Sequence, residues 1–150
     1  GLNRDIVVQE TESVENYLKT IWDLETRTGR AITGDLARCL EVAPASVTGM
    51  LKRLSTRGLI KYRPYQGATL AAEGRRTAVR VVRRHRLIET FLVEVMQVPA
   101  GLVHDEAERW EHVISDDMAE RMDVLLGRPL VDPHGAVIPR DEDPEPGAGS

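Results

Sequence analysis

The chain has 150 residues, of which 41% are hydrophobic, and its formal net charge at pH 7 is −4. This length fits one ordinary domain or two small lobes that share a core. No apolar run approaches the roughly 18 residues of a membrane span, and the first residues show no signal-peptide pattern. The single cysteine, Cys39, excludes an internal disulfide, so we predict a cytoplasmic protein with no membrane partner.

The net charge conceals a separation of the two signs along the chain. Residues 49–90 contain eleven lysines and arginines against two acidic residues, whereas residues 94–123 contain nine acidic residues against two arginines. A basic block followed by an acidic block indicates two surfaces that meet different partners. A solvated helical surface with scattered charge would mix the signs more evenly.

The first part of the chain predicts three helices. Residues 11–28 carry an apolar stripe at helical spacing, and residues 33–41 predict a short second helix in which Cys39 is buried. After a break, Pro44 suits the first turn of a third helix, which runs to about residue 56.

The remainder predicts a hairpin followed by two long helices. Residues 59–63 and 68–71 are expected to be short strands joined by a tight turn. Helices are predicted over 72–96 and over 103–126. Residues 128–150, rich in Pro, Gly and Asp, are expected to be mostly irregular.

This order of elements is typical of a winged helix-turn-helix. We therefore predict a mostly α fold, with a winged helix-turn-helix DNA-binding domain over residues 1–72. A helical domain follows over residues 73–139, and residues 140–150 are expected to form a disordered tail. A small helical core with a basic surface remains the alternative.

The third helix has the character of a DNA-reading helix. Small polar residues at its start allow a close approach to base edges in the major groove. The basic side chains that follow are placed to meet phosphates, and the hairpin tip can reach along the DNA backbone. The candidate DNA-contacting residues are Ala43, Pro44, Ala45, Ser46, Thr48, Gly49, Lys52, Arg53 and Gln66.

Imidazoles and carboxylates recur at helical spacing in the second half of the chain. Four of them, at i, i+4, i+7 and i+8, share one face of the predicted helix over 103–126. These four are His104, Glu108, Glu111 and His112. A further pair on the preceding helix consists of His85 and Glu89. His134 is expected to be a surface residue.

Imidazole and carboxylate donors without a thiolate suit Mn²⁺, Fe²⁺, Co²⁺ or Zn²⁺, and an oxygen-rich set favours Mn²⁺. The sequence therefore predicts a metal site. A salt-bridged interface without metal is the alternative. An enzyme is a further alternative, but no nucleophile–base pair or phosphate-binding loop accompanies the stripe.

Several segments resemble one known family. Residues 103–116 are similar to the metal-binding helix of the diphtheria toxin repressor family of iron- and manganese-dependent regulators, and residues 84–89 to its other ligand helix. Residues 15–21 resemble its first helix and residues 44–51 its recognition helix. The resemblance covers roughly residues 12–139.

The resemblance implies two metal sites. The residues matching the ancillary site are His85, Glu89 and His104, and those matching the primary site are Glu108, Glu111 and His112. Because manganese-type members carry glutamate and iron-type members cysteine at position 108, Glu108 implies Mn²⁺, with Fe²⁺ as the alternative. Zn²⁺, Co²⁺ or Cd²⁺ are expected to substitute in vitro. The remaining primary ligand falls at Asn16, for which Glu15 or Glu12 could substitute.

The resemblance also implies a function. We expect a short, manganese-type member without the SH3-like domain that longer members append. Its helical domain over 73–139 would bind metal and dimerise. The protein would be a metal-dependent repressor of metal-uptake genes that binds operator DNA as a homodimer and is not an enzyme. The alternative is a metal-independent winged-helix DNA-binding protein.

Overall fold

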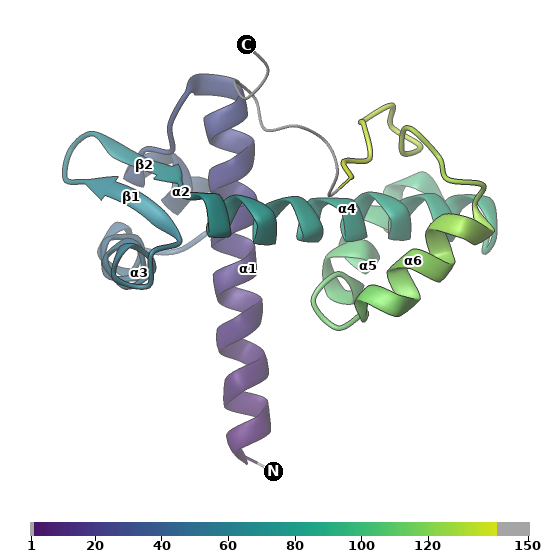
Figure 1. The fold of residues 1–150 in the computed structure, drawn as a ribbon, viewed down its shortest axis with the longest axis horizontal. Helices are drawn as coiled ribbons and strands as arrows, with labels where there is room; N and C mark the ends of the chain where they lie inside the picture. The colour runs from purple at the N-terminus through teal and green to yellow at the C-terminus, as the bar shows by residue number, and fades with distance from the viewer. Residues whose placement is uncertain (1, 141–150) are drawn as a thin grey trace. The chain divides into compact units, whose positions relative to one another are not determined.

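The computed structural model describes residues 2–140, with side chains from residue 11 onward. This part of the chain forms a mostly helical structure with one two-stranded sheet, which confirms the predicted fold class (Figure 1). The elements are α1 (Leu2–Thr28), α2 (Thr33–Leu40), α3 (Pro44–Thr56), β1 (Ile60–Arg63), β2 (Gly67–Leu70), α4 (Ala72–Glu94), α5 (Ala100–Trp110) and α6 (Asp116–Leu125).

The chain divides within α4 into two compact units, Gly1–Ala78 and Val79–Ser150. No helix among the described residues is long and apolar enough to cross a membrane.

The first helix is longer than the sequence pattern indicates. Its predicted apolar stripe is buried, with Leu18 and Ile21 fully inaccessible to solvent. However, α1 begins at Leu2 and not near residue 11. The predicted start was placed at capping residues, but no Pro or Gly interrupts residues 2–10, so the helix continues through them.

The helices α2 and α3 form the expected helix-turn-helix. Their buried faces pack into the core around α1, and α3 contributes Val47, Met50, Leu51 and Leu54. The prediction that Cys39 is buried is wrong, because its side chain is exposed. The buried side of α2 is formed by Leu36 and Ala37, and at about 100° per residue position 39 falls outside that arc.

The two strands form an antiparallel hairpin, the wing, in which Ile60 pairs with Leu70. It lies beside α3 in Figure 1. Ala31, in the α1–α2 connection, extends the sheet by exchanging two 2.8 Å backbone hydrogen bonds with Ala68. Gly67 is needed at this contact, since a Cβ there would lie 2.5 Å from the Ala31 carbonyl oxygen.

Glu25 connects α1 to the wing and to the start of α4. One of its carboxylate oxygens accepts the backbone N–H of Leu70 at 3.0 Å, and the other accepts Arg75 Nη2 at 2.7 Å. Both charged side chains are about four-fifths buried, so the pair is shielded from competing water. The base of the wing and the first turn of α4 are thereby held by one carboxylate.

The second unit has its core between α4 and α5, around Ile88, Leu92, Val103 and Ala107. The single helix predicted over 103–126 is wrong: α5 ends at Trp110 and α6 begins at Asp116. The break has a local cause. Ser115 is the N-cap of α6 and accepts the backbone N–H of Met118, while acidic residues occupy the first turn.

Residues 130–138 fold back on themselves to form what we call the C-terminal hairpin. Val131 and Val137 make an isolated antiparallel bridge, and Ile138 N–H donates to the Leu130 carbonyl at 2.9 Å. The rest of this region is irregular, as expected. The predicted disordered tail over 140–150 lies outside the described residues, except for Arg140.

Replacing Gly74 with alanine is expected to destabilise the N-terminal unit, because the added Cβ would lie 2.0 Å from the Leu59 carbonyl oxygen. Overpacking of this kind costs about 1–3 kcal/mol. Gly49, also in a helix, is the matched control, since a Cβ there meets nothing within 4 Å. Alanine should stabilise that helix by about 0.5–1 kcal/mol. Denaturant unfolding measures both changes, and equal stabilities would contradict this packing.

Candidate metal centre and DNA-binding surface

All four histidines of the chain belong to one network of imidazole–carboxylate pairs in the second unit. Imidazoles and carboxylates alternate along its main path. Each carboxylate that lies between two imidazoles is buried. In order, this path runs through His112, Glu111, His85, Glu89, His104 and Glu108. The fourth imidazole, of His134, contacts Glu89 as a branch.

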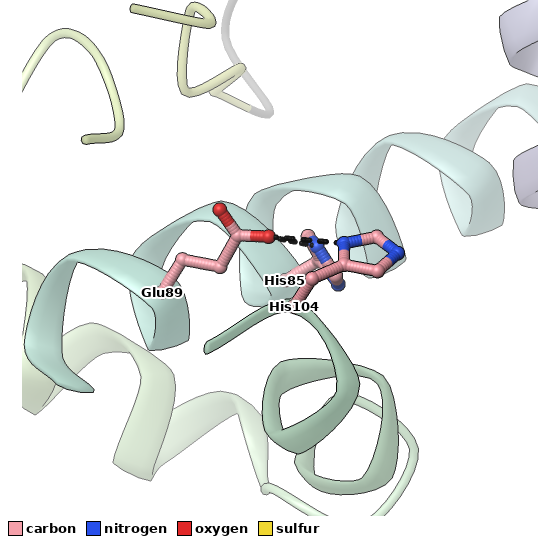
Figure 2. A group of neighbouring side chains, drawn as sticks. All are labelled: His85, Glu89 and His104. Atoms are coloured by element: carbon pink, nitrogen blue, oxygen red, sulfur yellow. Dashed lines mark hydrogen bonds and ion pairs between the residues drawn. The ribbon is translucent and has the colours of Figure 1, made fainter. Parts of the chain in front are cut away.

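The centre of the network combines side chains from α4 and α5. His85 and Glu89 are one helical turn apart on α4, and their Nε2 and Oε1 atoms are 2.5 Å apart. His104 on α5 directs Nδ1 at the same oxygen from 3.3 Å (Figure 2). Donor atoms of the three residues lie within 4.8 Å of one another. The structure therefore brings together three residues that the sequence analysis named as metal ligands.

A second donor group shares Glu89 but was missed from the sequence. His134 Nδ1 lies 2.9 Å from the other Glu89 oxygen, and donor atoms of Glu89, Asp132 and His134 again lie within 4.8 Å of one another. Asp132 Oδ1 also accepts the backbone N–H groups of His134 and Ala136, which fixes the turn. His134 is exposed, as expected, but it also contacts the network.

Glu111 is the C-cap of α5, where its backbone is still helical and its N–H donates to the Ala107 carbonyl at 3.0 Å, and His112 follows in the turn. Glu111 is fully buried and lies 3.2 Å from His85 Nδ1 and 3.4 Å from His112 Nε2. Glu108 is half-exposed and lies 3.2 Å from His104 Nε2. Among the described residues, neither close donor group includes Glu108, Glu111 or His112, so their role as a primary site stays a prediction.

The network perturbs the ionisation of its central pair. Burial disfavours a charged His85 imidazole, but hydrogen bonds and charge from Glu111 and Glu89 outweigh it and raise the pKa of His85 to about 9. Burial likewise acts to raise the pKa of Glu89, yet hydrogen bonds from His85 and His104 lower it to about 2. At neutral pH the pair is therefore an imidazolium facing a carboxylate.

Asn16 belongs to the N-terminal unit. It is half-buried on α1 and lines a small pocket with Glu12, Tyr17 and Val42, among others. Its backbone carbonyl accepts the Thr20 hydroxyl at 2.8 Å. Its predicted contribution to the primary metal site stays a prediction.

The candidate DNA-contacting residues lie on the surface of the N-terminal unit. Residues 43–46 are exposed at the start of α3, Thr48 and Gly49 are half-buried, and Lys52 and Arg53 are exposed. Gln66 is exposed in the turn of the wing. The opposite face of α3 is buried, so the helix presents one polar and basic face to solvent.

Two family models match the chain. The model described as "Iron dependent repressor, N-terminal DNA binding domain" matches residues 10–68. The model described as "Iron dependent repressor, metal binding and dimerisation domain" matches residues 71–140. The metal-ligand candidates other than Asn16 all fall within the second match, and the DNA-contacting candidates fall within the first.

Sequence similarity to known proteins supports the same family. The iron-dependent repressor IdeR of Mycobacterium leprae is 37% identical over 128 residues, covering 85% of this chain and 56% of that protein. IdeR of Mycobacterium tuberculosis is matched over 61% of its length, so the chain spans about three fifths of these curated relatives. An uncharacterized HTH-type transcriptional regulator of Methanocaldococcus jannaschii is 34% identical over 117 residues, covering 77% of this chain and 94% of that protein.

A solved structure of a manganese-dependent transcriptional repressor in complex with manganese has a TM-score of 0.81 and 38% identity to this chain. The similarity covers 89% of this chain and 63% of that one. These matches confirm the resemblance predicted from the sequence motifs: the chain belongs to the iron-dependent repressor, or diphtheria toxin repressor, family of metal-dependent transcriptional regulators.

Proposed function

We propose that this protein is a metal-dependent transcriptional repressor that binds operator DNA as a homodimer and regulates metal-uptake genes in the cytoplasm. The observation that carries the proposal is the pairing of all four histidines with buried carboxylates in the unit that matches a metal-binding family model. The helix α3 has an exposed polar face and lies in the segment that matches the DNA-binding family model. Both observations support the proposed binding of operator DNA.

The donor set favours Mn²⁺, with Fe²⁺ as the alternative. It offers imidazole nitrogens and carboxylate oxygens, and the one cysteine is on α2 in the other unit. Hard, oxygen-rich sites suit Mn²⁺ better than thiolate-rich ones do. Relatives are named iron-dependent repressors, and a structural neighbour is manganese-dependent, so both ions are within the range of the family.

We assign Glu89 as the central ligand, because it lies in both donor groups. A metal here would take His85 and His104 as nitrogen ligands, and Asp132 and His134 offer a second set from the C-terminal hairpin. The ion would supply a charge that cross-links α4, α5 and that hairpin. Glu108, Glu111, His112 and Asn16 remain proposed ligands of a further site.

The rival function is a winged-helix protein whose network is only a salt-bridged core. A salt-bridged core would contain the same imidazole–carboxylate pairs without any metal, and it would show no specific affinity for Mn²⁺ or Fe²⁺. A catalytic role is the weaker rival, since the chain belongs to a family of transcriptional regulators. Titration calorimetry with Mn²⁺ and Fe²⁺ under anaerobic conditions separates the first rival from the proposal.

Mn²⁺ is expected to increase DNA affinity by about 5–150-fold, the range of a 1–3 kcal/mol coupling. The test is a gel-shift titration in Mn²⁺ and in EDTA, with duplexes enriched from a random pool by the Mn²⁺-loaded protein. Glu89→Gln should abolish most of the difference because it removes a ligand from both donor groups. Glu94→Gln, an exposed carboxylate on the same helix, should retain it. Equal affinity of the wild-type protein in Mn²⁺ and EDTA would sink the proposal.

Lys52→Gln is expected to weaken binding to all duplexes to a similar extent, because the exposed ammonium is placed to meet a phosphate. The slope of log affinity against log salt concentration should become shallower by about 1. Arg27→Gln is the control, since Arg27 is exposed on α1 and paired with Asp23 at 2.7 Å. An unchanged slope for Lys52→Gln would show that Lys52 does not contact a phosphate.

Metal affinity is expected to rise with pH up to about 9, the pKa of His85, because Mn²⁺ must displace the imidazole proton. Below that value, affinity should increase about tenfold per pH unit. The folding stability of the metal-free protein should change with the opposite sign. The stability that comes from the raised pKa is fully present below the ordinary pKa of about 6.5 and is lost as pH rises through 9. Calorimetry in two buffers at pH 7.5 should detect about one proton released per ion, and His134→Ala should still release it.

A further inference from the structure

Asp123 is a buried carboxylate on α6 that contacts three arginines. Its Oδ2 atom accepts Arg83 Nη2 at 3.0 Å, Arg128 Nη1 at 2.9 Å and Arg140 Nη1 at 2.6 Å, and its Oδ1 atom accepts Arg140 Nη2 at 3.3 Å. The carboxylate itself is fully buried. So many charge-assisted hydrogen bonds to one buried group make a rigid junction.

The three arginines flank or share the segments that carry the metal-ligand candidates. Arg128 lies two residues before the C-terminal hairpin and Arg140 two residues after it, while Arg83 lies on α4, the helix that carries Glu89. Arg140 also donates to the Pro129 carbonyl at 3.2 Å. One carboxylate thus joins the two ends of the C-terminal hairpin to each other and to α4.

The C-terminal hairpin delivers Asp132 and His134 to Glu89. It contributes little to the apolar core, since Leu130, Val131 and Val137 are exposed and Ile138 is its one buried apolar side chain. Its position therefore depends on polar contacts. Apart from the Asp123 junction, these include the Arg86 contact with the Val137 carbonyl and the His134 contact with Glu89.

We propose that Asp123, together with Arg140, is a positioning residue for metal binding: it holds the C-terminal hairpin so that Asp132 and His134 reach Glu89. The inference rests on the proposed metal-binding function for its effect on affinity. Its effect on the hairpin itself can be measured without any metal.

Glu120 supplies a matched control. It contacts two of the same arginines, Arg83 at 3.1 Å and Arg128 at 2.6 Å, but it is half-exposed. None of its described contacts is with Arg140. Glu120→Gln therefore perturbs the same charge cluster while leaving both ends of the hairpin joined through Asp123.

The first measurement is amide hydrogen exchange of the metal-free protein. Arg140→Gln removes one end of the junction and should accelerate exchange in residues 130–138 at least about tenfold, with α4 and α5 unaffected. Glu120→Gln should leave exchange there within about twofold. Asp123→Asn should match Arg140→Gln, and Arg140→Gln decides the matter if Asp123→Asn does not fold. Unchanged exchange in Arg140→Gln would overturn the inference, whether or not the protein binds metal.

The second measurement is Mn²⁺ affinity by calorimetry. Arg140→Gln should weaken binding by about 10–100-fold, the usual effect of losing a residue that orients a ligand. In a His134→Ala background the further loss should be clearly smaller, because only Asp132 remains of the two side chains that Arg140 helps to position. An equal loss in both backgrounds, or no loss in either while the wild-type protein binds Mn²⁺, would overturn the inference. Absence of Mn²⁺ binding by the wild-type protein would instead refute the proposed function, and the exchange result would still decide whether Asp123 holds the hairpin.

Discussion

The metal-ligand candidates of the second unit gather around the buried carboxylate of Glu89, which contacts three imidazoles. A buried negative charge without partners would be strongly unfavourable, and the chain meets that requirement by placing His85, His104 and His134 around its two oxygens. The donor atoms of these residues therefore lie close together. Under the proposed metal-binding function, an ion would replace a proton at donors that already lie near one another.

Another buried carboxylate of this unit, that of Asp123, has partners that cannot lose a proton in this way. Asp123 contacts guanidinium groups, which keep their protons at any physiological pH, whereas Glu89 contacts imidazoles, which can lose theirs. Asp123 and Glu89 therefore differ in chemistry because guanidinium groups surround one and imidazoles surround the other. One cluster is permanent and supports structure, and the other can give up a proton to an incoming ion.

Much of the fold could be predicted from local pattern. The boundaries of α3, the wing and α4 follow from apolar spacing, from Pro44 and from the turn after Arg63. The break between α5 and α6 was missed because the helical spacing of the imidazoles and carboxylates runs past the end of α5 to His112, although Ser115 followed by two aspartates is a helix-start signal. The second donor group was missed for another reason: His134 lies in an irregular segment, and only the folded chain shows that this segment returns to α4.

The two hydrogen bonds accepted by the Glu25 carboxylate constrain the number of residues in α1. Both are committed, one to the backbone of β2 and one to Arg75, so the carboxylate must face a fixed direction. Each residue added to or removed from a helix rotates everything beyond it by about 100°. A one-residue insertion between Leu18 and Glu25 would therefore turn the carboxylate away from both partners even if the apolar stripe were restored. The spacing along this helix is constrained by geometry as well as by hydrophobicity, and related sequences should differ here by substitution and not by length.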